Sequence, residues 1–322
     1  MPAAVEQAQT RPVIDVSSLT KRFGAHTAVD DVTFTVPPGR VTAFLGPNGA
    51  GKSTTMRVLL GLDHATSGHA RIAGRPYRDH PEPLRVVGAH LDSRAVHPGR
   101  SGRQHLLALA RANGISARRV DEVLELVGIA AVGRRRAGDY SLGMAQRLGI
   151  AGALLGNPAV LVLDEPVNGL DTDGVRWIRD LLQGLAREGR TVLISSHLLA
   201  EVAQLAAHVL VMARSRLVAD SSLEALIADT TAPVEVTTPD DALVPRLLEN
   251  LPATAVLEAG TGEVLRLGGV TAEQVGEASH AVGLRLHRLV EGRSTLEAAY
   301  QRLVGADVEY AAGAVAAPAE AA

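Results

Sequence analysis

One short segment holds the residue types that bind phosphate groups. It fits the pattern G-x-x-x-x-G-K-[ST] and lies between an apolar run, 41–45, and a stretch with helical periodicity, 53–62. The glycines let successive backbone N–H groups turn inward around a polyphosphate, at the positive end of the helix dipole. The lysine would reach the β- and γ-phosphates, and the hydroxyl after it would bind Mg²⁺. We therefore expect a nucleotide at Gly46, Pro47, Asn48, Gly49, Ala50, Gly51, Lys52, Ser53 and Thr54, with Mg²⁺ at Ser53.

An acidic pair, Asp164-Glu165, directly follows the apolar run 160–163. Such a run is typical of a parallel strand covered on both faces, and open α/β sheets bind ligands at the carboxyl ends of their strands. Asp164 would hold Mg²⁺ through water, and Glu165 would polarise the attacking water. The alternatives, a chance glycine-rich turn and a solvated acidic turn, do not explain the wholly apolar strand or Pro166 after it.

Further motifs give the family. Over residues 13–229 the sequence resembles the ATP-binding subunits of ABC transporters. The resemblance implies a signature segment at 140–147, a D-loop at 168–171, a switch histidine after the run 191–194, and an aromatic residue that stacks on adenine. The residues that carry these roles by resemblance are Ser141 and Gly143, Asp171, His197 and Phe23.

Two motifs depart from the family pattern. Asp92 lies where most members carry the glutamine of the Q-loop; it could bind Mg²⁺ or orient water but cannot donate as an amide does. In the signature, Leu142 and Met144 replace the usual glycine and glutamine. Together with the run 95–101 and an appended small domain, these substitutions make the sequence resemble the ATPases of drug-resistance exporters typified by daunorubicin and bacitracin resistance. Members of that branch pair with a separate ABC-2 type membrane subunit.

The resemblance also implies a mechanism. In the family, ATP lies between two subunits, held by the phosphate loop of one and the signature helix of the other. We therefore expect a homodimer that hydrolyses ATP, with Glu165, His197 and Lys52 as its catalytic groups. The expected partners are a second copy and the membrane subunit, with no nucleic acid.

Composition limits the class of protein. The 322 residues are 46% hydrophobic and 21% charged with a formal net charge of −3, as in a folded globular protein. The chain has no cysteine, which excludes disulfides and thiolate metal sites. The longest uncharged stretch, 148–163, is too short to span a membrane. We expect a cytoplasmic protein, peripheral on the inner face of the membrane through its partner.

The elements that position these residues alternate between strand and helix. The period-2 runs 13–16 and 32–36 predict antiparallel strands, and the pattern from 84 to about 156 predicts a helical insertion between two sheet strands. We expect an α/β fold class; the resemblance implies a P-loop NTPase (ABC ATPase) domain with antiparallel and helical subdomains, and a small α+β ferredoxin-like domain should follow it. The expected parts are a flexible arm (1–12), the ATPase domain (13–229), the small domain (234–304) and a disordered tail (305–322).

Two other functions remain open at this point. A soluble ABC ATPase that serves translation, DNA repair or cluster assembly would share these motifs. A P-loop kinase or GTPase would share the phosphate loop but would need neither a signature helix nor a dimer. The transported substrate cannot be inferred, because selectivity belongs to the membrane subunit.

Overall fold

The computed structural model describes residues 13–92, 95–228, 233–261, 264–292 and 294–312, so the expected arm at 1–12 lies outside the described residues. The chain divides into two compact units between Ser222 and Leu223, rather than near 229. Among the helices of the described residues, none is long and apolar enough to cross a membrane.

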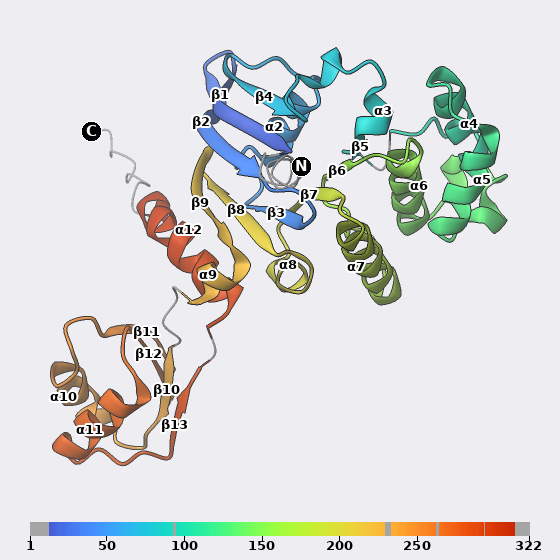
Figure 1. The fold of residues 1–322 in the computed structure, drawn as a ribbon. Coiled ribbons are helices and arrows are strands. Elements are labelled where there is room, and N and C mark those ends of the chain that lie inside the picture. The colour runs from blue at the N-terminus through green and yellow to red at the C-terminus, as the bar shows by residue number, and fades with distance from the viewer. Residues whose placement is uncertain (1–12, 93–94, 229–232, 262–263, 293, 313–322) are drawn as a thin grey trace, which may run out of the picture. The chain divides into compact units, whose positions relative to one another are not determined.

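The first unit is built on a six-stranded sheet (Figure 1). Its order is β5-β6-β7-β3-β8-β9; the first five strands are parallel, and β9 pairs antiparallel with β8. Strands β3, β6 and β7 are wholly buried, as the mostly apolar sequences of β3 and β6 and the run Val192–Ile194 in β7 predict. The strands are β3 (Val41–Leu45), β5 (Val87–His90), β6 (Val160–Leu163), β7 (Thr191–Ser196), β8 (His208–Ala213) and β9 (Arg216–Ser222).

An antiparallel sheet of three strands completes the core of this unit. Its order is β2-β1-β4, formed by β1 (Ile14–Phe23), β2 (His26–Val36) and β4 (Ser67–Ile72). Strands β1 and β2 are longer than the runs 13–16 and 32–36 suggested, because their pairing continues through bulges to the turn between Phe23 and His26. Phe34 of β2 packs on Phe44 of β3 with ring centroids 5.4 Å apart, so the two sheets share one core.

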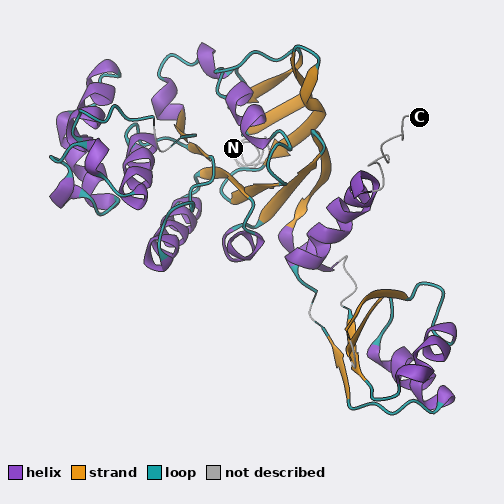
Figure 2. Cartoon of the chain, turned by 180° about the vertical axis from the view of Figure 1, so that it is seen from behind, coloured by secondary structure: helices purple, strands orange, loops and turns teal. Residues whose placement is uncertain are grey.

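Figure 1 and Figure 2 show α4 to α6 gathered at one side of the first unit, where α6 packs against β5 of the six-stranded sheet. These three helices form the insertion, while α2, α7 and α8 follow strands of the six-stranded sheet. The insertion is less helical than predicted at its start, where β5 forms the edge of the sheet. Four residues that include Gly88 and His90 are too short and too mixed to give a strand pattern. The helices are α2 (Lys52–Leu59), α3 (Pro83–Val86), α4 (Gly102–Ala112), α5 (Ala117–Leu126), α6 (Leu142–Leu154), α7 (Thr172–Arg187) and α8 (Leu199–Leu205), with 3-10 turns at Tyr77–Asp79, Ala130–Val132 and Ala137–Asp139.

The second unit contains a four-stranded antiparallel sheet. Its order, β11-β12-β10-β13, is that of a ferredoxin-like sandwich. The last strand lies at 288–291. The final helix runs to Ala312, so residues 305–312 of the expected disordered tail are helical, and the rest of that tail lies outside the described residues. The elements are α9 (Leu223–Ala228), β10 (Val234–Thr237), a 3-10 turn (Asp241–Leu243), α10 (Val244–Glu249), β11 (Val256–Thr261), β12 (Val264–Gly268), α11 (Ala272–Val282), β13 (Arg288–Glu291) and α12 (Leu296–Ala312).

Candidate active site

The glycine-rich loop connects β3 to α2 and is tightly enclosed at two positions. Gly46 has φ +153° and Gly51 has φ +100°, a region that favours glycine. A Cβ at Gly46 would lie 2.4 Å from the carbonyl oxygen of Met212 in β8, and one at Gly51 would lie 2.4 Å from that of Ala28 in β2. The loop therefore runs between the two sheets, where only glycine fits at these two positions.

Lys52 begins α2 and lies inside this loop, with only 6% of its surface exposed. Its Nζ donates to the carbonyl oxygens of Gly46 at 2.7 Å and Pro47 at 3.1 Å. Burial lowers the pKa of Lys52, while the negative charges of Glu165 and then Asp164 oppose this shift. The ammonium group is therefore close enough to both carboxylates to interact with them electrostatically.

The acidic pair stands at the carboxyl end of β6 and is held by β7. The Ser195 hydroxyl donates to Asp164 Oδ1, and the backbone N–H of Glu165 donates to Ser195 Oγ at 2.9 Å. Glu165 has φ +49°, an uncommon conformation for a residue with a side chain. Its two carboxylate oxygens each lie 3.0 Å from Nδ1 of His197, which follows β7. The structure thus brings together Asp164, Glu165 and His197, as the sequence predicts.

A pocket of about 380 Å³ opens beside the loop. Its lining consists of Phe23, His26, Ala28, residues 48–54 and Glu165. Phe23 is 49% exposed, and the Lys21 ammonium lies 4.6 Å from its ring centroid. An aromatic ring, a loop of backbone N–H groups with a lysine, and a carboxylate therefore surround one space, which suits a base, a polyphosphate and its hydrolysis.

The other expected site residues on α6 and α7 do not line this pocket. Ser141 is exposed and caps α6 by accepting from the backbone N–H of Met144 at 3.2 Å. Gly143 faces the D-loop, where an added Cβ would lie 3.3 Å from the carbonyl oxygen of Gly169. Asp171 caps α7 by accepting from the N–H of Gly174 at 2.8 Å. These residues present an exposed edge of the chain.

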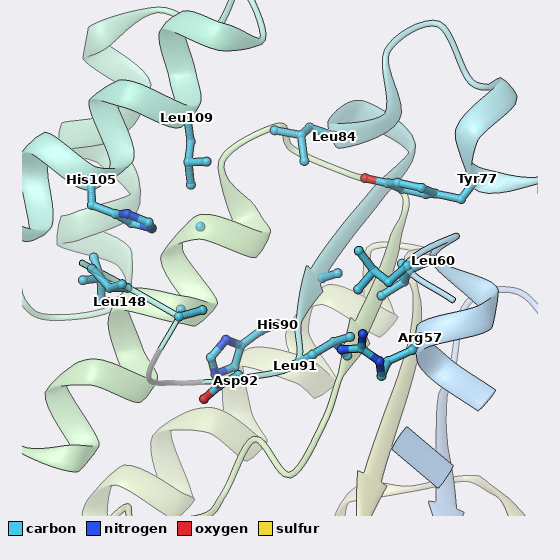
Figure 3. A pocket seen from close by; sticks show the side chains of 16 residues that line it. Arg57, Leu60, Tyr77, Leu84, His90, Leu91, Asp92, His105, Leu109 and Leu148 are labelled. Atoms are coloured by element: carbon cyan, nitrogen blue, oxygen red, sulfur yellow. The ribbon is translucent and has the colours of Figure 1, made fainter. Parts of the chain in front are cut away.

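Asp92, the residue expected at the Q-loop position, follows β5. It lines a second pocket of about 520 Å³, together with apolar residues of α2, α4 and α6. Figure 3 shows His90, Leu91 and Asp92 together at the end of β5, with Leu84, Leu109 and Tyr77 around the same space. The lining of the first pocket does not include Asp92. Burial lowers the pKa of the neighbouring His90.

Sequence reasoning missed three polar residues that hold the acidic pair. Ser195 contacts both acidic residues, Gln146 of α6 donates from Nε2 to the carbonyl oxygen of Glu165 at 3.1 Å, and the carbonyl of His90 accepts from the N–H of Asp164 at 2.8 Å. Ser195 could have been found as a polar residue that follows the apolar run 192–194 and precedes the switch histidine. Gln146 lies within the signature segment 140–147, but nothing local in the sequence marks its contact with Glu165 or the contact made by the carbonyl of His90.

Comparisons with known proteins agree with this geometry. The family model described as ABC transporter matches residues 29–168. The bacitracin transport ATP-binding protein BcrA of Enterococcus faecalis is 34% identical over 301 residues, covering 91% of this chain and 96% of that protein.

Solved structures share the fold of the first unit. One described as the ATP-binding subunit of an ABC transporter has a TM-score of 0.62 and 26% identity, covering 67% of this chain and 92% of its own. A dimeric ATP-binding cassette in a post-hydrolysis state, bound to ADP and Pi, has a TM-score of 0.60 at 22% identity, covering 65% and 98%. The chain therefore belongs to the ABC transporter family, as an ATP-binding subunit with ATPase activity.

Proposed function

We propose that the chain is half of a homodimer whose ATP hydrolysis drives export through a separate ABC-2 type membrane subunit. The observation that carries the proposal is the pocket enclosed by Phe23, the phosphate loop and Glu165, with His197 at hydrogen-bond distance from that carboxylate. Phe23 would stack on adenine, and residues 46–54 would bind the phosphates.

The catalytic roles follow from the charges around this pocket. Glu165 would orient and polarise the water that attacks the γ-phosphorus in line with the leaving oxygen. His197 would hold the Glu165 carboxylate and, in its protonated form, would donate to the γ-phosphate. Lys52 would exchange its bonds to Gly46 and Pro47 for phosphate oxygens, and its charge would stabilise the transition state.

The residues present also fit a magnesium ion. The Ser53 hydroxyl lines the pocket in the first turn of α2, and Asp164 is close enough to Lys52 to affect its pKa. Hydroxyl and carboxylate oxygens are the hard ligands that Mg²⁺ takes beside substrate phosphates. When bound, Mg²⁺ would neutralise phosphate charge. To bind the ion, Asp92 would have to approach it from the second pocket.

A second copy would complete the site. Ser141 and Leu142 are exposed at the N-terminus of α6, and Leu142 has 50% of its surface exposed. The α6 N-terminus, with Ser141 and Gly143, would face the γ-phosphate bound by the other copy. Asp171 would lie at the same interface. The dimeric state of a cassette with the same fold supports this arrangement.

The relative's name supports the class of transport. BcrA is a bacitracin transport ATP-binding protein, and the chain matches nearly all of it, including the second unit. We infer export of an antibiotic-type compound and a position on the cytoplasmic face of the membrane. A soluble ABC ATPase is the alternative. Purification from membranes should recover an integral membrane protein with the chain; recovery with ribosomes or DNA, and without such a protein, would favour the alternative.

Glu165→Gln tests the proposed chemistry. The amide is nearly isosteric but cannot serve as a base. The variant should bind ATP with wild-type affinity, lose turnover by at least about 100-fold, and accumulate as an ATP-bound dimer in size-exclusion chromatography. Wild-type turnover in this variant would reject Glu165 as the base.

A further inference from the structure

His90 is a buried residue whose side chain has no role assigned above. It ends β5, and only 5% of its surface is exposed. Its ring lies against Gly149 of α6: a Cβ at that glycine would be 2.1 Å from Cε1 and 2.2 Å from Nδ1 of His90. The imidazole therefore occupies space that exists only because α6 has a glycine at this position.

Gln146 lies one turn before Gly149 on α6 and contacts both His90 and Glu165. Its Nε2 donates to the Glu165 carbonyl oxygen at 3.1 Å, and its side chain is hydrogen-bonded to the His90 ring. The Gln146 amide can accept from a ring N–H of His90 through its oxygen or donate to a ring nitrogen through its second N–H, so it can pair with either neutral tautomer. With 3% of its surface exposed, the Gln146 side chain is enclosed and has two partners, the Glu165 carbonyl and the His90 ring.

The backbone of Glu165 needs such support. Its φ of +49° is disfavoured for a residue with a side chain and persists only where the surroundings enforce it. Gln146 holds the carbonyl group, and Ser195 holds the N–H group at 2.9 Å. The backbone next to Glu165 is also held, because the carbonyl oxygen of His90 accepts from the N–H of Asp164 at 2.8 Å.

We propose that His90 and Gln146 are positioning residues for Glu165: the imidazole, seated over Gly149, orients the Gln146 amide, which holds the Glu165 backbone so that its carboxylate meets His197. This inference rests on the proposed role of Glu165 as the base. His90 also lines the second pocket (Figure 3), so one imidazole connects that pocket to the helix bonded to Glu165.

The sharpest test changes the seat of the ring and leaves every hydrogen-bonding side chain in place. In the full chain, Gly149→Ala should displace His90, because the new methyl group would overlap it. Gly152→Ala is the matched control on the same helix, since its Cβ would meet only Leu106 and Leu109 side chains at 3.8 Å. Misplacing a catalytic group by about 1 Å can cost about 100-fold in rate. We expect Gly149→Ala to lower kcat by about 10- to 100-fold with KM for ATP within about twofold, and Gly152→Ala to match the wild type.

A double-mutant cycle tests the link between the two side chains. His90→Leu and Gln146→Leu should each lower kcat by about tenfold. The kcat of the double variant should be no lower than that of the less active single variant, because both side chains act through one contact. His90→Gln, which keeps an N–H donor, should restore part of kcat. A merely structural role would lower thermal stability without this rescue.

The outcomes separate this inference from the proposed function. Equal kcat values for Gly149→Ala and Gly152→Ala would overturn the positioning role. So would a double variant whose kcat falls by the product of the two single fold-reductions. Should Gly149→Ala not fold, the cycle decides alone. If Glu165→Gln loses turnover but His90→Leu keeps the wild-type kcat, only this inference is refuted. If Glu165→Gln keeps full turnover, the proposed role of Glu165 as the base is refuted as well.

Discussion

Gly51→Ala perturbs the phosphate loop at a position where two costs can be separated. An L residue at φ +100° costs about 1–3 kcal/mol in backbone strain. The new Cβ would also lie 2.4 Å from the carbonyl oxygen of Ala28, and overpacking of this kind costs about a further 1–3 kcal/mol. Gly49→Ala is the control, since its φ of +82° carries a similar strain but no atom lies within 4 Å of the added Cβ.

The difference between the two variants therefore measures the enclosure of the loop. Gly51→Ala should unfold at a lower temperature than Gly49→Ala by about 2–12 °C, taking about 2–4 °C per kcal/mol for a unit of this size. The fluorescence of Trp177, the single tryptophan of the chain, reports unfolding of the first unit. Gly51→Ala should also bind ATP more weakly than Gly49→Ala. Equal unfolding temperatures and equal ATP affinities would refute the claim that both sheets fix this loop.

Two further predictions concern the polar groups of the first unit. Ser195→Ala should lower the free energy of unfolding by about 1–3 kcal/mol and kcat by about tenfold, because the N–H of Glu165 loses its acceptor and Asp164 loses a donor. Urea unfolding and ATPase assays measure the two effects, and unchanged values would contradict the role of Ser195. Stability should also fall as the pH drops below about 6.5, because burial lowers the pKa of His90 and His208 and only the unfolded chain then takes up their protons. His208→Asn should weaken this dependence in urea unfolding between about pH 7.5 and 5.5; an unaltered dependence would show that the pKa of His208 is the same in the folded and unfolded chain.

Much of the fold follows from local patterns. The run 160–163 is apolar throughout, and 41–45 is apolar except for Thr42, because both faces of these strands are covered; each run is followed by a motif that needs the carboxyl edge of a sheet. Strand β5 escaped prediction because four residues give no period, and its pairing with β6 depends on partners remote in sequence.

The site divides in a similar way. Lys52, Glu165 and His197 could be predicted because each lies in a short motif at the end of a strand. The side chains that hold them could not. Gln146 can bond to the Glu165 carbonyl only because α6 passes the end of β6. The space for the His90 ring depends on Gly149, which lies far from it along the chain. Such contacts between distant segments leave no local sequence pattern.

The most direct test asks whether ATP brings the loop of one copy to the signature of another. The chain has no cysteine, so Asn48→Cys and Leu142→Cys can be introduced singly at exposed positions. The two variants, each also carrying Glu165→Gln and differing in size by a tag, are mixed and oxidised. The proposed dimer predicts a mixed cross-linked species that forms with ATP and Mg²⁺ and not without nucleotide. No mixed species with ATP, or the same amount without it, would contradict a site shared between two copies.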